Sequence, residues 1–307
     1  MTGAPKNGEI APIGVAFLVF DGFQPIDLSG PWQAFATAND ELGHVRYALS
    51  TCGLADTAST TDGGLRILVD HTLDASSATA FHTVVVPGGE GVHAASRDSA
   101  FTRWLRHQDT RSHRTCSVCS GAFLLAAAGV LDGQSVTTHW RTADRLRRDY
   151  PQLDVADERI FHESGKYWTA AGVTAGIDLA LGLIERDCGE LIAQRVARRL
   201  VVYLRRSGDQ RQYSQTLRLQ DRAGAPFRAL IDKMEADLAR DWHVDDMSDE
   251  CAMSRRTFQR KFKAQFGVAP SEVLRGLRTD RAQMLLAGGT LSRKDIARQV
   301  GMAPGDF

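Results

Sequence analysis

The chain has 307 residues, of which 37 are Lys or Arg and 37 are Asp or Glu, and its hydrophobic content is 43%. This length is long for one compact domain and suits two, and the composition is that of an ordinary globular protein. The stretch 1–12 lacks the cationic start and apolar core of a signal peptide, and the apolar run 15–20 is too short to span a bilayer. These features argue against a secreted or membrane protein, so we expect a cytosolic chain with reduced thiols and no membrane partner.

The net charge of zero conceals an uneven distribution. Residues 1–190 hold 15 Lys and Arg against 23 Asp and Glu, a difference of −8, whereas residues 191–307 hold 22 against 14, a difference of +8. A split of this kind indicates that only the second part binds a polyanion.

Strands and helices are predicted to alternate through the first 200 residues. The continuous apolar run 13–20 is typical of a parallel strand that is covered on both faces. Ser29 and Pro31 then mark the start of a helix, as its cap and as a first-turn residue. Further strands are predicted at 45–51, 65–69, 83–86, 115–118, 136–140, 159–162 and 167–170, and further helices at 101–107, after Cys119, after Trp140, at 172–186 and at 190–203.

This alternation predicts a three-layer α/β domain with a mostly parallel sheet. In such sheets, ligands bind at the carboxyl ends of the strands. Asp21, the pair Gly88 and Gly89, Cys119 and His139 all lie at or near such ends. We therefore expect the functional site at that edge of the sheet.

The stretch 115–129 passes without a spacer from a buried strand to an Ala- and Leu-rich helix, and the turn between them carries Cys119, Ser120 and Gly121. A nucleophile elbow has this layout, because its sharp turn lifts one side chain above the sheet. The N-terminus of the following helix favours a negative charge, so the sequence predicts a lowered pKa for the Cys119 thiol. Cys116 lies within the strand and faces the opposite way, so we do not interpret the two cysteines as a redox pair.

Residues 242–270 predict a helix-turn-helix. A short helix at 245–252 is followed by a turn and by a second helix at 255–266, which Ser254 caps. Phe258 and Phe262 form the buried face of that second helix and leave a basic, polar face outside. Such a helix enters the major groove, where Arg and Gln read guanine and adenine edges. The predicted DNA-binding residues are Ser254, Arg255, Arg256, Thr257, Gln259, Arg260 and Lys263.

The C-terminal region resembles the AraC/XylS family over residues 239–307, most specifically at 253–262 and 267–270. The resemblance implies two helix-turn-helix units joined by a long helix, here 271–287. Residues 291–302 repeat the first helix and turn, and the family's second recognition helix is absent from the 307 residues.

Residues 12–190 resemble the PfpI/ThiJ superfamily, the class I glutamine amidotransferase-like fold. The matching positions are Asp27 within 26–31, the turn at 87–89, the Cys119 elbow and the stretch 137–139. The order of the two domains is that of GlxA-like regulators. Enzymes of the superfamily often have Glu where this chain has Asp27, and the set Asp27, Cys119 and Ser120 is similar to that of the isonitrile hydratases.

Two interpretations of the elbow stay open. In the catalytic one, Cys119 is a nucleophile, Asp27 shares or shuttles a proton, His139 is a base, and the N–H groups of Gly89 and Ser120 hold an oxyanion. In the other, which we favour, the elbow is a retained ligand pocket, because a regulator needs its effector to stay bound. The residues assigned to that pocket are Cys119, Asp27, Ser120, His139, Gly88 and Gly89. A pocket that senses oxidation through Cys119 would need a low thiol pKa and access.

The sequence thus predicts a flavodoxin-like, PfpI-type α/β domain at 12–204 that senses a small metabolite, a linker at 205–225, and an all-α double helix-turn-helix domain at 226–307 with an incomplete C-terminal end. The expected function is a DNA-binding transcriptional regulator, a homodimer whose partners are double-stranded DNA and a small-molecule effector. The alternative is a cysteine-dependent hydratase or amidase-like enzyme with an accessory DNA-binding domain. We expect neither a cofactor nor a metal, because no His, Cys and carboxylate set has metal-site spacing.

Overall fold

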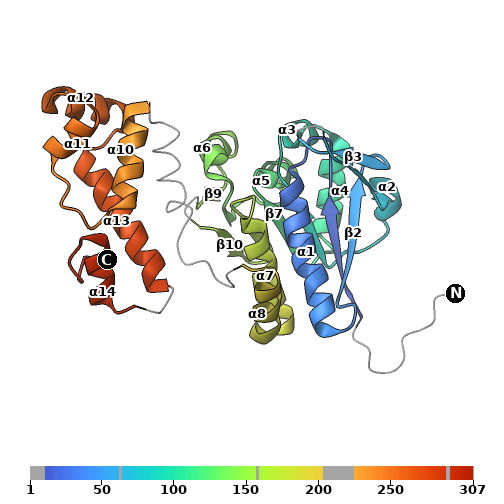
Figure 1. Ribbon diagram of the computed structural model, residues 1–307. Helices are drawn as coiled ribbons and strands as arrows, with labels where there is room; N and C mark the ends of the chain where they lie inside the picture. The colour runs from blue at the N-terminus through green and yellow to red at the C-terminus, as the bar shows by residue number, and fades with distance from the viewer. Residues whose placement is uncertain (1–10, 62–63, 157–158, 203–224, 288–290, 307) are drawn as a thin grey trace. The chain divides into compact units, whose positions relative to one another are not determined.

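The computed structural model describes residues 11–61, 64–156, 159–202, 225–287 and 291–306. The chain divides into two compact units, Met1–Arg206 and Ser207–Phe307 (Figure 1). The predicted linker at 205–225 lies outside the described residues except for Ala225, which begins a helix.

A seven-stranded sheet organises the first unit, in the order β10-β11-β7-β6-β1-β2-β5. β10 and β11 pair antiparallel, and every other neighbouring pair in this sheet is parallel. The predicted fold class, an α/β domain with a mostly parallel sheet, is confirmed. The strands of this sheet are β1 (Ile13–Leu18), β2 (Tyr47–Gly53), β5 (His71–Thr72), β6 (Thr83–Val86), β7 (Arg114–Val118), β10 (Phe161–Ser164) and β11 (Tyr167–Ala170).

The helices of the first unit form two groups. α1 packs on α7 and α8, whereas α5 packs on α3 and α4. Their apolar faces and the sheet make one continuous core. The helices are α1 (Pro25–Leu42), α2 (Leu73–Ser76), α3 (Val92–Ala95), α4 (Ser99–Asp109), α5 (Gly121–Ala127), α6 (Trp140–Asp149), α7 (Ala175–Cys188) and α8 (Glu190–Arg199).

Two predicted strands do not join the main sheet. The segment predicted at 65–69 forms β4 (Arg66–Leu68), which pairs antiparallel with β3 (Thr57–Ser59). The segment predicted at 136–140 contributes only β8 (Ser135–Val136), which pairs with β9 (Asp154–Val155). Leu68 is 80% exposed, which shows that the apolar residues of β4 are not covered as those of a central strand are.

The start predicted for the first helix is also wrong. α1 begins at Pro25 with Gln24 at the N-cap, so Ser29 and Pro31 lie inside the helix. The physical reason is that Pro25 suits the first helical position, where its fixed φ fits and its missing N–H has no intrahelical partner. The earlier start places Asp27 in the first turn of α1, next to the carboxyl end of β1.

The second unit is helical. Its elements are α10 (Ala225–Ala236), α11 (Val244–Glu250), α12 (Arg255–Phe266), α13 (Pro270–Ala287) and α14 (Arg293–Val300). Three phenylalanines at helical spacing, Phe258, Phe262 and Phe266, form the buried face of α12 and pack on Phe227 of α10. The predicted helix-turn-helix is therefore α11 and α12. Within the described residues of both units, no helix is long and apolar enough to cross a bilayer.

Candidate functional site

The turn at Cys119 has the backbone geometry of an elbow. Cys119 stands between β7 and α5 with a φ of 57°, a left-handed conformation that a side chain other than glycine adopts at a cost of about 1–3 kcal/mol. Two bonds hold it there: its N–H donates to the Ala170 carbonyl at 2.9 Å, and its carbonyl accepts the Thr138 hydroxyl at 2.8 Å. The surroundings thus fix a strained residue at the edge of the sheet.

Sheet register brings three loops around this turn. β7 lies between β6 and β11, with Ser117 opposite Val86 and Val118 opposite Ala170. The segments that follow these strands therefore meet at Cys119. Both Gly88 and Gly172 approach so closely that an added Cβ would lie 2.8 Å and 2.4 Å, respectively, from the Cys119 Cβ. Glycine is required at these two positions because backbone packs directly on the elbow.

Asp27 is fully buried beside the elbow. Its Oδ2 atom accepts the Gly88 N–H at 3.0 Å, and its Oδ1 atom accepts the Val173 N–H at 2.8 Å. Burial raises the pKa of Asp27 to about 6, against the opposing effect of the hydrogen bonds from Gly88, Val173 and Cys119. A carboxyl group with a pKa near neutrality can hold or release a proton at physiological pH.

The lowered thiol pKa that the elbow predicted for Cys119 is wrong. Burial and, second, the nearby Asp27 carboxylate raise the pKa of this thiol above its usual range, although hydrogen bonds from Ser120 oppose the shift. The N-terminus of the short helix α5 does not compensate for the desolvation and the adjacent acid. Cys119 is therefore a neutral thiol at physiological pH, which argues against an oxidation sensor of the low-pKa kind.

The donors proposed for an oxyanion are already engaged. The Gly89 N–H donates to the Ser120 hydroxyl oxygen at 3.0 Å. The Ser120 N–H interacts with the Cys119 sulfur, and this bond opposes the rise in the thiol pKa. One cluster thus contains the predicted residues Asp27, Gly88, Gly89, Cys119 and Ser120. Their polar groups bond to one another, so the donors proposed for an oxyanion are already occupied.

His139 bonds at the start of α6 and not within this cluster. It occupies the N-cap of α6, where its Nδ1 atom accepts the Arg141 N–H at 3.3 Å. Burial and the Arg141 charge lower the pKa of His139, so the ring is neutral. Among the hydrogen bonds of the described chain, none joins His139 to Cys119 or Asp27, whereas the preceding Thr138 does reach Cys119. A role of His139 as base stays a prediction that this geometry does not support.

Sequence reasoning missed the loop that closes the cluster. Gly172 covers Cys119, and Val173 donates to Asp27 while its own φ is 52°. The available signal was a glycine two positions after the end of a predicted strand, at the carboxyl edge of the sheet. The helix start predicted at Gly172 is wrong, since α7 begins at Ala175.

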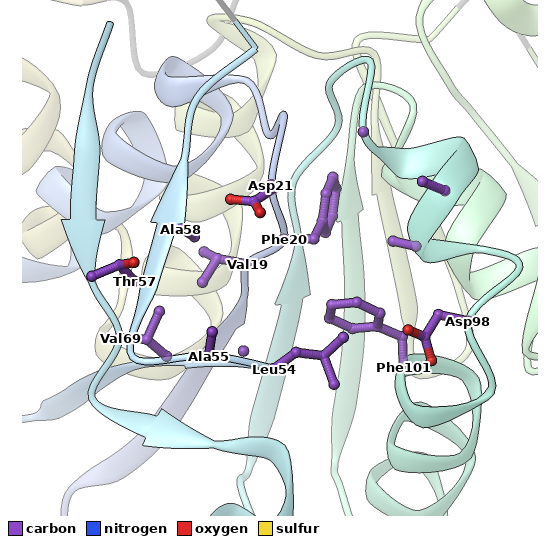
Figure 2. Close-up of a pocket in the computed structure, with 14 residues that line it drawn as sticks. Val19, Phe20, Asp21, Leu54, Ala55, Thr57, Ala58, Val69, Asp98 and Phe101 are labelled. Atoms are coloured by element: carbon purple, nitrogen blue, oxygen red, sulfur yellow. The ribbon is translucent and has the colours of Figure 1, made fainter. Parts of the chain in front are cut away.

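A separate pocket lies beside the elbow. Its volume is about 210 Å³, and it opens to solvent between the carboxyl ends of β1 and β2, β3 and the α3–α4 segment (Figure 2). Cys119, Ser120 and Asp27 do not line it. The pocket touches the elbow region through Asp21 and Gly91, because the Gly91 N–H donates to the Gly22 carbonyl at 3.0 Å.

The second candidate site is the outer face of α12. Six of the seven predicted DNA-binding residues have exposed side chains, and Thr257 is half-buried. Ser254 occupies the N-cap, but its hydroxyl donates to Thr257 Oγ1 at 3.0 Å instead of accepting a backbone N–H, so the predicted side-chain cap is absent. The Arg255 guanidinium lies 3.1 Å from the Asp245 carboxylate of α11. Within the described residues, no group of His, Cys, Asp and Glu could hold a metal ion.

Comparison with protein families gives two matches, one in each unit. Residues 14–186 match the DJ-1/PfpI family, and residues 234–275 match the bacterial regulatory helix-turn-helix proteins of the AraC family. The first match covers the sheet, the elbow and Asp27, and the second covers α11 and α12.

The relatives include transcriptional regulators and an enzyme. The chain is 28% identical over 298 residues to the transcriptional regulator GbdR of Pseudomonas aeruginosa, an alignment that covers 97% of this chain and 79% of that protein. It is 30% identical to the transcriptional regulator GlxA of Rhizobium meliloti, over 72% of this chain and 68% of that protein. It is 33% identical to isonitrile hydratase of Pseudomonas putida, over 59% of this chain and 75% of that enzyme.

Solved structures show the same fold. A ThiJ/PfpI family protein from Pseudomonas syringae matches with a TM-score of 0.56 and 25% identity, over 65% of this chain and 81% of that one. The predicted resemblance to GlxA-like regulators is confirmed. The chain belongs to the DJ-1/PfpI family, and it joins that domain to a helix-turn-helix of the AraC family of transcriptional regulators.

Proposed function

We propose that this protein is a transcriptional regulator that binds double-stranded DNA through α12 and responds to a small molecule through its DJ-1/PfpI domain. The observation that carries the proposal is the exposed basic face of α12, which stands on an AraC-type helix-turn-helix with a well-packed aromatic inner face. A recognition helix of this kind places Arg and Gln at base edges of the major groove. The protein acts in the cytosol as a homodimer, since helix-turn-helix dimers bind two half-sites.

The protonation and hydrogen bonding of the elbow residues favour ligand binding over catalytic turnover. The Cys119 thiol is neutral, the Gly89 N–H is bonded to Ser120, and His139 caps a helix. A cysteine nucleophile requires a thiolate or an adjacent base, and an oxyanion hole requires donors that are free to receive charge. The domain therefore serves as a sensor in this proposal.

A salt titration tests the DNA-binding part. Duplex fragments from the region around the protein's own gene are titrated with the full chain at several salt concentrations. Specific binding that weakens steeply with salt is expected, because phosphate contacts release counterions. Arg256→Ala should reduce the salt slope by about one if Arg256 contacts a phosphate. The control, Arg148→Ala, also removes an exposed charge, but from the first unit, and should leave the slope unchanged. Equal affinity for all sequences, or no binding at any salt, contradicts the proposal.

One observation favours a second candidate, a cysteine-dependent hydratase. Asp27 has a pKa of about 6 and interacts directly with the Cys119 thiol, so its carboxylate can act as a general base that takes up the thiol proton while the sulfur attacks a substrate. The test is turnover of simple isonitriles and amides by the full chain and by Cys119→Ala. Turnover that disappears in the variant supports the enzyme, and turnover that persists in the variant rejects it.

A further inference from the structure

Within the described residues of the second unit, apolar side chains form two separate cores. The first joins α10, α11 and α12, and the second lies beneath α14. α13 contributes to both, since Val273, Leu274 and Leu277 belong to the first core and Ala282 belongs to the second (Figure 1). The orientation of α14 relative to the helix-turn-helix of α11 and α12 therefore depends on α13 and on whatever else holds α14 in place.

Arg278 lies on α13 at the boundary between the two cores, directly after Leu277 and before Ala282. Its guanidinium bonds the backbone of the segment that connects α10 to α11. Nε donates to the Leu238 carbonyl at 2.9 Å, and Nη2 donates to the Arg240 carbonyl at 2.7 Å. Because two nitrogens of one planar group reach two carbonyls, the side chain fixes a direction as well as a distance.

The connecting segment 237–242 is itself held in the first core. The Trp242 indole N–H donates to the Asp237 carbonyl at 2.9 Å, and the Arg240 guanidinium lies over the Trp242 ring, 4.2 Å from its centroid. The side chains of Leu238 and Trp242 are buried members of that core. The bonds from Arg278 therefore join α13 to a fixed part of the first helix-turn-helix.

The C-terminus of α14 packs on the same segment. Gly301 ends α14 in the left-handed region with a φ of 69°. A Cβ on Gly301 would lie 2.8 Å from the Leu238 carbonyl oxygen, 3.1 Å from the Ala239 Cα and 3.1 Å from the Arg278 Nη2. Glycine is required here because the connecting segment and the guanidinium approach its backbone so closely. The connecting segment, the middle of α13 and the end of α14 thus meet in one joint at Arg278.

The outer face of α14 carries cationic side chains. Arg293, Lys294 and Arg298 are all exposed. The Arg293 Nε donates to the Pro304 carbonyl at 3.3 Å, and Arg298 forms an ion pair with Asp295 at 2.9 Å. The Lys294 ammonium forms no such bond within the described residues. Of the three cations, Lys294 is therefore the one most available to a phosphate group.

We propose that Arg278 is a positioning residue for DNA binding: it joins α14 to the first helix-turn-helix, so that α12 and α14 contact one duplex in a fixed relative orientation. Residues 291–302 repeat the pattern of a first helix and its turn. The first helix of such a motif crosses the phosphate backbone, which assigns Lys294 to a phosphate. The contact with DNA rests on the function proposed above, whereas the joint does not.

The joint matters for affinity because a contact made by a fixed helix does not pay the cost of ordering that helix on binding. Without the bonds from Arg278, α14 is held mainly by the second core, whose buried members among the described residues are Ala282, Ile296 and Val300. The contribution of Lys294 to DNA affinity should therefore depend on Arg278. A coupling of this kind distinguishes positioning from a general loss of stability.

The test is a double-mutant cycle on the full chain, measured by fluorescence anisotropy with one selected duplex at about 0.1 M salt. Lys294→Ala should weaken binding about fivefold in the wild type and about twofold or less in Arg278→Ala. Arg281→Ala is the matched control, because it removes an exposed charge from the same helix and should leave the effect of Lys294→Ala unchanged. Equal effects of Lys294→Ala in the wild type and in Arg278→Ala overturn the proposal, and so does the lack of any effect in the wild type.

Arg278→Lys separates position from charge. Lys keeps the charge, but a single ammonium does not reproduce the forked bond to the Leu238 and Arg240 carbonyls. Lys294→Ala should therefore weaken binding by about twofold to threefold in this variant, less than in the wild type. A full return to the wild-type effect would show that the charge at position 278 is sufficient, which overturns the positioning role.

Gly301→Ala disturbs the joint while Arg278 stays in place. The added Cβ should push the end of α14 away from the connecting segment and reduce the effect of Lys294→Ala to about twofold. Gly267→Ala is the matched control, since Gly267 also ends a helix with a left-handed φ, 81°, and no atom lies within 4 Å of an added Cβ. Both variants are compared well below their thermal unfolding temperatures, so that each is folded. The same effect of Lys294→Ala in both variants contradicts the proposal.

Amide hydrogen exchange without DNA tests the joint independently of the regulator function. Exchange in α14 should be at least about tenfold faster in Arg278→Ala, with exchange in α12 unchanged, and Arg281→Ala should change neither. A chain that shows this acceleration but binds no specific DNA overturns the regulator function and supports the joint. A chain that binds DNA specifically but whose α14 exchanges equally in the wild type and in Arg278→Ala overturns the joint alone.

Discussion

The buried carboxylate of Asp27 accepts the backbone N–H of Val173 at 2.8 Å, and this bond holds Val173 in the left-handed region with a φ of 52°. A β-branched residue in that conformation is strained, and such strain persists only where neighbouring groups impose it. The same carboxylate also holds Gly88 on the other side of Cys119. Asp27 thus connects the two loops that enclose the elbow, and its protonation state should affect both.

The first prediction concerns the pH dependence of stability. The pKa of Asp27 is raised from 3.8 to about 6 in the folded chain, so the stabilisation due to its proton is complete below pH 3.8 and is lost as the pH rises through 6. Asp27→Asn removes this dependence. The free energy of unfolding of the variant minus that of the wild type should therefore rise by about 2.4 kcal/mol between pH 4 and pH 7, since each pH unit between the two pKa values contributes up to about 1.4 kcal/mol. Urea unfolding followed by Trp fluorescence measures the free energy of unfolding of both proteins at each pH. Parallel plots of this free energy against pH for the wild type and the variant would contradict the prediction.

The second prediction concerns the reactivity of Cys119. Because burial and Asp27 raise the thiol pKa, alkylation of Cys119 by iodoacetamide at pH 7.5 should be at least about tenfold slower in the folded chain than in the unfolded chain. Asp27→Asn should accelerate the reaction in the folded chain by removing the adjacent negative charge. Mass spectrometry of the labelled peptide gives the rate, and Cys119→Ala identifies the peptide. Fast labelling of the folded wild type would show that the thiol is activated.

The third prediction concerns the glycine that covers the elbow. Gly172→Ala places a Cβ 2.8 Å from the Cys119 sulfur at a residue with a φ of +105°, and it should destabilise the first unit by about 3 kcal/mol or more. Gly165→Ala is the control: its φ is +61° and no atom lies within 4 Å of an added Cβ, so only the backbone cost of about 1 kcal/mol is expected. Equal destabilisation in urea unfolding would mean that the close approach at Cys119 does not matter.

The fourth prediction concerns the ion pair beside the recognition helix. Arg255 and Asp245 are 60% and 66% exposed, so their pairing contributes little to stability. Asp245→Asn removes a negative charge from the DNA-facing side and releases Arg255, which should strengthen DNA binding several-fold at low salt and by less at high salt. Asp144→Asn breaks a comparable exposed ion pair in the first unit and should change nothing. A similar affinity change in both variants, measured by fluorescence anisotropy, would show a non-specific charge effect.

Much of the fold follows from local patterns. The apolar run at β1, the strand-to-helix turn at Cys119 and the aromatic spacing of α12 each involve residues that are close in sequence, and each was predicted correctly. The errors are of two kinds: the start of α1 and the cap of α12 are local errors, whereas the position of β4 depends on which strand pairs with β2. β4 lies outside the sheet because β5 (His71–Thr72), which follows it closely in the chain, pairs with β2 instead, and a short apolar run does not reveal its partner.

Only part of the site was predicted, because several of its contacts join segments that are far apart in the sequence. The elbow is a local motif, whereas the Val173 N–H reaches Asp27 across 146 residues of chain, and only the sheet register brings the two together. The direction of the thiol pKa shift at Cys119 could not be predicted because it depends on burial and on Asp27, which outweigh the helix N-terminus. The pocket between Asp21 and Asp98 has no sequence motif, since its walls come from five separate segments.

Selection of duplexes from a random pool tests the central claim, that α12 reads DNA sequence, most directly. The full chain, Arg255→Ala, Arg260→Ala and Arg148→Ala are each used to select bound duplexes at physiological salt. The account predicts one enriched motif for the wild type and for Arg148→Ala, and the loss of about 1–3 kcal/mol of base discrimination at one position of that motif for Arg260→Ala. No enriched motif, or the same motif with undiminished discrimination in Arg260→Ala and in Arg255→Ala, would contradict it.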